Sequence, residues 1–295
     1  MEKVLQINNL SKNYGNIRAI ENVSFEVNKG EVYGMLGPNG SGKTTTLAVI
    51  MGILNANGGS YEWFEQPFSK FSRRRIGALI ETPNFYPYLT LWENLKIVAK
   101  IKDADEKDIN NALGVANLLK RKHTNFGHLS LGMKQRMSIA SVLIGNPEVL
   151  ILDEPTNGLD PEGFAEVRNI ILSQADAGKT IIIASHILDE VEKVCSHVAI
   201  LKSGDLIANG RVGELLSSEE TVFIQTEKPE DLIMSIKESN LAKEVYPSDE
   251  DVAVVLNADL NSGDLNKFCF EKGFTLTKIQ VRKQSLEDQF LQLVK

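Results

Sequence analysis

Hydrophobic and polar positions alternate along the first 36 residues, most clearly in Val23-Ser-Phe-Glu-Val27. Apolar side chains at every second position turn one face of a strand toward a core and leave the other to solvent, which predicts antiparallel strands. Val149–Leu152 and Thr180–Ala184 differ, because β-branched and leucine residues follow one another there without alternation. Such runs fit parallel strands of a sheet covered on both faces, with a helix between the two.

Helical spacing replaces the alternation between about residues 84 and 146. The first apolar stripe is formed by Leu91, Leu95 and Val98, and a second is formed by Ile109, Leu113 and Ala116. Recurrence at three and four positions is the pattern of an amphipathic helix. The block therefore predicts a helical insert in an α/β chain.

Residues 216–295 are predicted to form a separate small domain. Strand-like and helical segments follow in the order β, α, β, β, α, β, and a further helix is predicted over Ser285–Leu293. In chain order, the six segments are Thr221–Gln225, Pro229–Ser239, Lys243–Tyr246, Val252–Leu256, Ser262–Glu271 and Phe274–Val281. This order is typical of a ferredoxin-like α+β domain. The remaining residues, 1–215, are enough for a larger first domain.

The composition is that of a globular protein with a sizeable core, since 42% of the residues are hydrophobic and 24% are charged. No apolar run approaches the roughly 18 residues that indicate a membrane span, and the N-terminus lacks a signal pattern. We therefore expect a cytoplasmic protein. The net charge of −7 argues against nucleic-acid binding, and the basic run Arg73-Arg74-Arg75 fits a solvated helix face. Cys195 and Cys269 lack metal-ligand spacing, so we expect ordinary thiols.

A glycine-rich segment after the strand-like Glu31–Leu36 carries the strongest chemical signal, because it has the pattern G-x-x-x-x-G-K-T. Its residues are Gly37, Pro38, Asn39, Gly40, Ser41, Gly42, Lys43 and Thr44, with Thr45 next to them. The glycines let backbone N–H groups converge on phosphate oxygens, and the start of the following helix attracts the same anion. Lys43 places a positive charge on the terminal phosphates, and the Thr44 hydroxyl can ligate Mg²⁺. The segment predicts a site for a nucleotide triphosphate with Mg²⁺.

Two carboxylates, Asp153 and Glu154, directly follow the apolar strand Val149–Leu152. Asp153 can hold Mg²⁺, and Glu154 can polarise a water aimed at the γ-phosphate. General-base assistance of this kind accelerates a reaction roughly 10²- to 10⁴-fold. A lone Asp-Glu pair commonly marks only the solvent end of a strand, so the interpretation depends on the phosphate loop.

A third segment has the features of a helix start that binds an anion. Ser130 is a good N-cap, and Gly132 leaves backbone N–H groups unobstructed. Leu131 and Met133 complete the segment, and helical residues continue to Ile144. Taken alone, these residues fit an ordinary capped helix equally well.

In their order along the chain, these motifs resemble those of ATP-binding cassette (ABC) ATPases, the nucleotide-binding subunits of ABC transporters. The resemblance covers roughly residues 3–215, with the phosphate loop as Walker A, Leu129–Arg136 as the signature and Asp153 and Glu154 closing Walker B. Thr156–Asp160 resembles the D-loop, and Ala184–His186 the switch-histidine segment. The resemblance implies a P-loop α/β fold with a mixed β-sheet core, an antiparallel β subdomain and a helical subdomain.

The resemblance also implies roles for single residues. His186 would contact the γ-phosphate and act with Glu154 in catalysis, although a histidine after an apolar strand is more often structural when it stands alone. Asp160 would shape the site of the facing subunit. Tyr14 would place its ring on adenine, and a plain exposed tyrosine is the competing interpretation. Glu81 stands where many members have Gln and would still ligate Mg²⁺.

Two departures from the usual motifs point to one branch of the family. Leu131-Gly132 replaces the common Gly-Gly, and Glu81 replaces Gln. Both resemble exporters that protect against bacitracin and lantibiotic-type peptides, and so does Ser285–Phe290 near the C-terminus. The resemblance therefore implies ATP hydrolysis that powers export of a drug or antimicrobial peptide.

One copy of each motif implies an assembly. In this family the signature of one domain closes on ATP held by another, so two copies of the chain would meet head to tail as a homodimer. A separate permease would supply the membrane spans, with the ATPase peripheral on the inner face of the cell membrane and the insert near Glu81–Trp92 as the contact. Two alternatives stay open: a soluble ABC ATPase with a non-transport role, and an importer ATPase whose residues 216–295 are regulatory.

Overall fold

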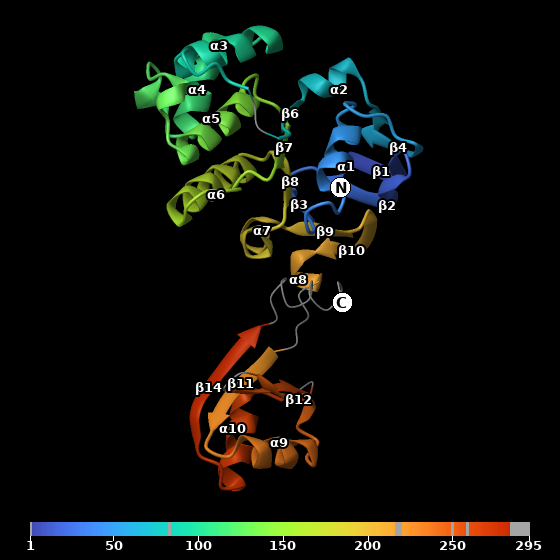
Figure 1. Cartoon of the computed structure of the whole chain (residues 1–295), viewed down its shortest axis with the longest axis vertical. Coiled ribbons are helices and arrows are strands. Elements are labelled where there is room, and N and C mark those ends of the chain that lie inside the picture. Colours follow the sequence, from blue (N-terminus) through green and yellow to red (C-terminus); the bar gives the residue numbers. More distant parts are fainter. Residues whose placement is uncertain (1, 82–83, 216–219, 249–250, 258–259, 284–295) are drawn as a thin grey trace. The chain divides into compact units, whose positions relative to one another are not determined.

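The computed structural model describes residues 2–81, 84–215, 220–248, 251–257 and 260–283 (Figure 1). By its internal packing the chain divides after Val212 into two compact units. Among the described residues, no helix combines the length and the apolar character needed to cross a bilayer.

The first unit begins with the predicted antiparallel sheet, which has the strand order β2-β1-β4-β5. Its strands are β1 (Lys3–Tyr14), β2 (Ile17–Asn28), β4 (Gly58–Trp63) and β5 (Gln66–Pro67). Val23, Phe25 and Val27 of β2 are buried, as their alternation predicts. This face packs on the second sheet, where the Phe25 ring stacks on Tyr33 with 5.1 Å between centroids.

The second sheet has the order β10-β9-β3-β8-β7-β6, and every neighbouring pair in it is parallel except β9 with β10. Its strands are β3 (Val32–Leu36), β6 (Ile76–Leu79), β7 (Val149–Asp153), β8 (Thr180–Ser185), β9 (His197–Lys202) and β10 (Asp205–Arg211). The two predicted parallel strands, β7 and β8, are central and fully buried. The short β6 escaped sequence analysis because it contains Gly77. A Cβ at this glycine would lie 2.2 Å from the carbonyl oxygen of Val142, so glycine lets the backbone of the facing helix approach.

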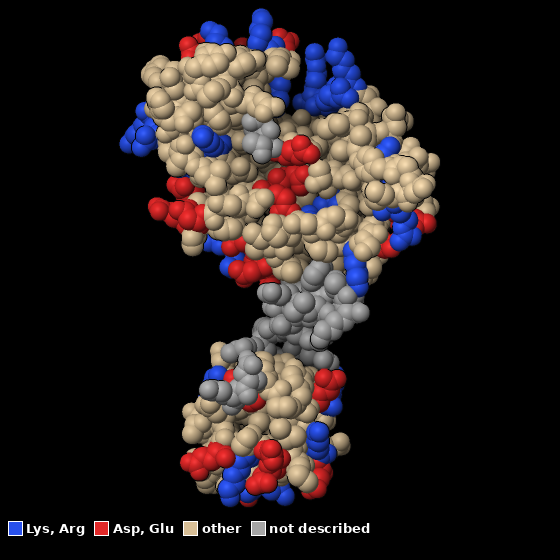
Figure 2. All heavy atoms as spheres, in the orientation of Figure 1, with Lys and Arg blue, Asp and Glu red and all other residues tan. Residues whose placement is uncertain are grey.

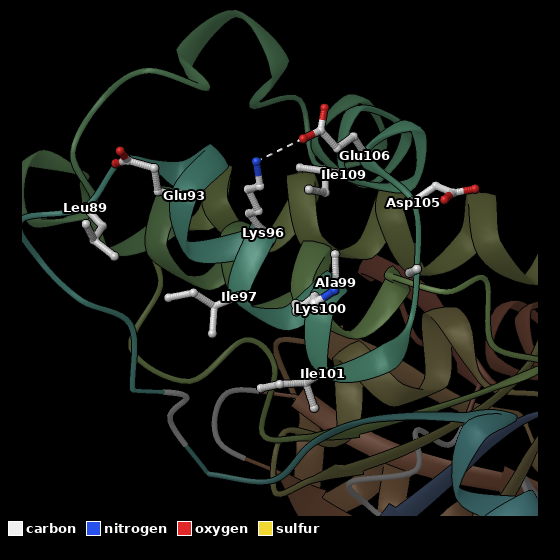
Figure 3. A pocket seen from close by; sticks show the side chains of 11 residues that line it. Leu89, Glu93, Lys96, Ile97, Ala99, Lys100, Ile101, Asp105, Glu106 and Ile109 are labelled. Atoms are coloured by element: carbon white, nitrogen blue, oxygen red, sulfur yellow. Dashed lines mark ion pairs between the residues drawn. The ribbon is translucent and has the colours of Figure 1, made fainter.

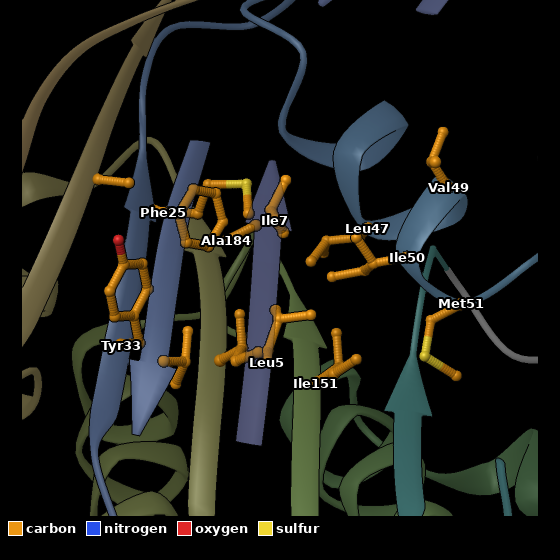
Figure 4. Close-up of a cluster of buried hydrophobic side chains, with 14 of the residues drawn as sticks. Leu5, Ile7, Phe25, Tyr33, Leu47, Val49, Ile50, Met51, Ile151 and Ala184 are labelled. Carbon is orange, nitrogen blue, oxygen red and sulfur yellow. The ribbon is translucent and has the colours of Figure 1, made fainter. Parts of the chain in front are cut away.

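Helix α1 (Lys43–Ile50) and the antiparallel sheet lie on one side of the second sheet and share a single hydrophobic core with it (Figure 4). Helices α5 (Leu131–Leu143), α6 (Pro161–Asp176) and α7 (Leu188–Val194) cover the other side (Figure 1). Because both faces are covered, the parallel strands carry apolar residues without alternation.

The helical insert is confirmed. It contains α3 (Leu91–Lys102), α4 (Glu106–Val115) and α5, with the short turns η1 (Leu119–Arg121) and η2 (Phe126–His128) between them. Of the two predicted stripes, Leu91, Leu95, Ile109, Leu113 and Ala116 are buried. Thr90 and Glu93 form a reciprocal capping box that fixes the start of α3.

The prediction for the basic run is wrong at Arg75. Helix α2 (Lys70–Arg74) ends before this residue. The Arg75 guanidinium lies 3.4 Å from the centroid of the Phe64 ring and pairs with the Glu148 carboxylate at 2.6 Å. Its side chain is therefore held by an aromatic face and an anion, and it is not a free solvated charge.

The second unit has the predicted order of elements. After the short helix α8 (Val212–Leu215) come β11 (Glu220–Thr226), α9 (Pro229–Lys237), β12 (Ala242–Ser248), β13 (Asp251–Leu256), α10 (Ser262–Glu271) and β14 (Leu276–Lys283). The sheet order is β12-β13-β11-β14, and all neighbouring strands are antiparallel. Leu232, Ile236, Leu265 and Cys269 of the two helices pack on this sheet. The predicted helix over 285–293, with the segment 285–290 that supported the exporter resemblance, lies outside the described residues.

Candidate functional site

The glycine-rich loop joins β3 to α1, and its neighbours leave no room for side chains at two positions. A Cβ at Gly37 would lie 2.3 Å from the carbonyl oxygen of Leu201, and one at Gly42 would lie 2.6 Å from that of Ala19. The φ of 104° at Gly42 also belongs to the left-handed region that favours glycine. The remaining loop residues divide by exposure: Pro38, Asn39 and Gly40 are exposed, Ser41 is buried, and Thr45 is half-buried.

Lys43 is the first residue of α1, and its side chain folds back over the loop. The ammonium Nζ donates to the carbonyl oxygens of Gly37 at 2.7 Å and Pro38 at 3.2 Å, and lies 3.4 Å from Glu154 Oε1. Only 5% of this side chain is exposed. A buried cation thus stands at the start of a helix whose N-cap, Gly42, has no side chain to cap the first N–H groups. Both features favour an anion at this place.

Thr44 and Asp153 meet at the opposite side of the same loop. The Thr44 hydroxyl donates to Asp153 Oδ2 at 2.8 Å, while the buried Oδ1 of Asp153 has no hydrogen-bond partner among the described residues. Burial raises the pKa of this carboxyl, the charges of Glu154 and Glu81 raise it further, and the Thr44 bond and Lys43 oppose the shift. A buried carboxylate with an unpaired oxygen is suited to a cation.

Glu154 is brought to His186 because β7 and β8 are parallel neighbours and end at the same edge of the sheet. Glu154 Oε2 lies 2.8 Å from Nδ1 of His186, and its backbone N–H donates to the carbonyl oxygen of Ala184 at 2.8 Å. The backbone of Glu154 has a φ of 47°, a left-handed value that is uncommon outside glycine. Residues held in this conformation cluster at active sites and ligand-binding segments.

One cavity of about 540 Å³, called the phosphate-loop cavity below, is lined by Thr44, Glu81, Asp153 and Glu154 together with residues of α5. Figure 2 shows acidic side chains gathered in a hollow of the larger unit. The structure therefore brings together the phosphate loop and the four predicted catalytic or metal-binding side chains Glu81, Asp153, Glu154 and His186.

The third motif lines a different cavity, of about 390 Å³. Ser130 is the N-cap of α5, where its hydroxyl accepts from the backbone N–H of Met133 at 3.3 Å. Asp160 is the N-cap of α6, where its Oδ1 accepts from Gly163 N–H at 2.8 Å. Ser130, Gly132, Met133 and Asp160 all line this second cavity, and Leu131 lines both. Two helix starts therefore face one space, apart from the phosphate loop.

Tyr14 is not joined to either cavity. It ends β1, the residue is 46% exposed, and the Lys12 ammonium lies 5.6 Å from the ring centroid. Both interpretations of this residue, an adenine contact and an exposed tyrosine, are compatible with its position.

Sequence analysis missed the turn that supports the phosphate loop from behind. Gly204, between β9 and β10, donates its N–H to the carbonyl oxygen of Ser41 at 3.1 Å. Its φ of 91° and the 3.0 Å from an added Cβ to the Ala19 carbonyl oxygen both require glycine. The Ser203-Gly204 dipeptide was a turn signal, but nothing in it indicates which loop it supports.

Comparison with known proteins agrees with this geometry. The family model described as ABC transporter matches residues 20–157. The bacitracin transport ATP-binding protein BcrA of Bacillus licheniformis is 36% identical over 300 residues, covering 100% of this chain and 98% of that protein. The lantibiotic transport ATP-binding protein SrtF of Streptococcus pyogenes is 42% identical over 207 residues, 69% of this chain and 89% of its own.

A solved structure shows the same fold. The cbiO1 protein of Clostridium perfringens, described as part of the ABC transporter complex cbiONQ, superposes with a TM-score of 0.67 and 31% identity. The match covers 74% of this chain and 92% of that one. The resemblance drawn from the motifs and the fold class are thus confirmed. The chain belongs to the family of ABC transporter ATP-binding proteins and is the ATPase of an ABC transporter.

Proposed function

We propose that this ATPase binds ATP together with Mg²⁺ at the phosphate-loop cavity. The unpaired buried oxygen of Asp153 and the adjoining Thr44 hydroxyl are hard oxygen ligands of the kind that Mg²⁺ prefers. Glu81, on the wall of the same cavity, supplies a third oxygen donor. Bound there, Mg²⁺ neutralises charge on the phosphates.

The contact that carries the proposed mechanism is the one between Glu154 and His186. With its carboxylate 2.8 Å from the imidazole and 3.4 Å from the Lys43 ammonium, Glu154 stands between the imidazole of His186 and the cation that attracts the γ-phosphate. Glu154 acts as the general base that polarises the attacking water, and His186 orients it and contacts the γ-phosphate. Lys43 stabilises the negative charge of the phosphates.

Two copies of the chain complete two sites. The helix starts at Ser130 and Asp160 share a cavity that does not include the phosphate loop of the same chain. They are free to close on ATP bound by a second copy in a head-to-tail homodimer, with Gly132 offering an open N–H beside Ser130. Hydrolysis removes the γ-phosphate that links the copies, and the pair opens.

A separate membrane permease receives this motion. An apolar groove of about 690 Å³ between α3 and α4 supports this proposal, because the exposed Ile97 and Ile101 stand on its wall (Figure 3). The ATPase then lies in the cytoplasm on the inner face of the cell membrane. In this proposal residues 1–215 are the nucleotide-binding domain and residues 216–295 an accessory domain.

The transported compound is a peptide antibiotic, and the direction is export. The support is the similarity to BcrA over the full chain and to SrtF over the first domain, since these relatives are bacitracin and lantibiotic transport proteins by name. Expression with its permease in a sensitive bacterium is expected to raise the inhibitory concentration of bacitracin or a lantibiotic. Unchanged sensitivity with active ATPase in the membrane would refute peptide export.

The Glu154→Gln variant tests the mechanism. It is expected to bind ATP normally, to hydrolyse it roughly 10²- to 10⁴-fold more slowly, and to accumulate as an ATP-bound dimer in light scattering. Normal turnover would reject Glu154 as the base. A variant that binds ATP–Mg²⁺ but stays monomeric would reject the head-to-tail pair.

A further inference from the structure

An ion pair joins the two helices that start at the second cavity. Arg136 of α5 places Nε 3.1 Å from Oε2 of Glu166 on α6, and only 10% of the arginine side chain is exposed. Both side chains line the same cavity as Ser130 and Asp160. Helices α5 and α6 lie side by side (Figure 1).

Arg136 also holds a third helix. Its Nη1 donates to the carbonyl oxygen of Ala116 at 3.0 Å, and Ala116 is the C-cap of α4. A cation is favourable at a helix C-terminus, where carbonyl groups lack intrahelical partners. The bond to Ala116 holds the guanidinium in place, and the Glu166 carboxylate faces its positive charge as an ion pair, since the buried Nε has no hydrogen-bond partner among the described residues.

The position of the pair along the two helices gives it a geometric consequence. Arg136 comes six residues after the N-cap Ser130, and Glu166 comes six residues after the N-cap Asp160. Six residues are about 9 Å of helix, so the ion pair ties α5 to α6 at the same depth below their two starts. It thereby sets the axial register of Ser130 against Asp160. A slip by one residue would displace one start by about 1.5 Å.

We propose that Arg136 and Glu166 are positioning residues that hold the signature and the D-loop in one register, so that both close together on the ATP of a second copy. The inference rests on the proposed head-to-tail pair. Neither side chain is assigned a contact with ATP; both act through Ser130 and Asp160. Misplacement of contacting groups by about 1 Å can cost on the order of 10²-fold in rate, which sets the scale of the expected effect.

The Glu166→Gln variant removes the charge and keeps the shape of the side chain. In a Glu154→Gln background its ATP-dependent dimer is expected to dissociate about tenfold more readily in sedimentation. In the otherwise native chain kcat is expected to fall about tenfold, while the Kd of the isolated chain for a fluorescent ATP analogue stays unchanged. A lower kcat with an unchanged Kd distinguishes a positioning role from general destabilisation, which would weaken nucleotide binding as well.

The Lys3–Glu26 pair provides a matched control, since its atoms are 2.7 Å apart and it joins β1 to β2 at an exposed place outside both cavities and the α3–α4 groove. Glu26→Gln is expected to leave dimerisation and kcat unchanged. Arg136→Met completes a double-mutant cycle with Glu166→Gln, and the two effects on dimerisation are expected to be strongly non-additive. If Arg136→Met does not fold, dimer dissociation and kcat of the Glu166→Gln variant are sufficient to test the inference.

The outcomes separate the inference from the proposal beneath it. If Glu154→Gln with an intact ion pair forms no dimer, the head-to-tail pair fails first. If that dimer forms and Glu166→Gln leaves its dissociation constant and kcat as they were, the register inference is overturned.

Discussion

The two cavities of the first unit differ in how they are built, and in the proposed mechanism both bind the same triphosphate. At the phosphate-loop cavity the carboxylates have partners within the same chain: Glu154 lies 3.4 Å from the Lys43 ammonium, and Asp153 accepts from the Thr44 hydroxyl. The second cavity is lined by capped helix starts at Ser130 and Asp160. The first is suited to gripping a ligand within one chain. The second offers helix dipoles and N–H groups, which in the proposed head-to-tail pair bind the ATP of another copy.

Loss of the Lys43 charge is expected to have the largest effect on this contrast. Lys43→Ala should weaken ATP binding about 100-fold, or about 2.7 kcal/mol, because a desolvated cation attracts phosphate strongly. Lys179→Ala is the matched control, since the Lys179 ammonium also donates to two oxygens, of Asn146 at 2.7 Å and Pro147 at 2.6 Å. Calorimetric titration with ATP measures both variants. Equal affinity in Lys43→Ala and the native chain would contradict the phosphate-loop assignment.

At the second cavity, Ser130→Ala is expected to leave the ATP affinity of the isolated chain unchanged while weakening the ATP-dependent dimer. It should also cost about 1 kcal/mol of stability through the lost N-cap, measured as a lower melting temperature. Ser69 caps α2 with a bond of the same 3.3 Å length, so Ser69→Ala is the control for capping away from both cavities. Equal dissociation constants of the ATP-dependent dimer in Ser130→Ala and Ser69→Ala would show that the helix start at Ser130 has no special role in dimerisation.

Neutralising the buried carboxylate of Asp153 is expected to stabilise the fold, because burial disfavours its charged form. The folded chain raises the pKa of Asp153 above its ordinary value of about 3.9. Between the ordinary pKa and the raised pKa in the folded chain, the folded state binds more protons than the unfolded state. The free energy of unfolding therefore falls as pH rises through this range. Asp153→Asn should therefore raise the melting temperature at pH 7 and abolish Mg²⁺-dependent turnover, and its stabilising effect should vanish near pH 3. A lower melting temperature at pH 7 would show that the carboxylate stabilises the fold.

The smallest effect on ATP binding and dimerisation is expected at the far end of the signature helix. Lys102 points its ammonium at the carbonyl oxygens of Val142 at 3.2 Å and Ile144 at 3.1 Å, and burial lowers its pKa to about 8. The unfolded state binds the additional proton between about pH 8 and the ordinary lysine pKa of about 10.4, so this side chain makes stability rise with pH there. Lys102→Met should remove that rise. Identical pH dependence of the melting temperature in both proteins would show that the carbonyl contacts keep the lysine charged.

Much of this molecule follows from residues close together in sequence. The phosphate loop could be identified because its function needs consecutive glycines, a lysine and a threonine in fixed order. The stripes of α3 and α4 and the six elements of the second unit could be predicted because periodicity records which face is buried. The edge strand β10 was missed because none of its residues is buried, and β6 was missed because it is only four residues long and contains Gly77.

Local sequence patterns did not predict the pairings between distant residues, and only the family resemblance placed Thr44 with Asp153 and Glu154 with His186 at one site. Thr44 donates to Asp153, which is 109 positions away in the sequence, and Arg75 of the basic run forms an ion pair with Glu148. Glu154 meets His186 only because two strands became parallel neighbours. The Arg136–Glu166 bridge needs two helices in one register. The sequence alone determined the family, the nucleotide motif and the local elements, because each depends on neighbouring residues. The tertiary structure decided which charges share a cavity, because an electrostatic interaction depends on distance in space and on burial, and neither is written in the spacing of the chain.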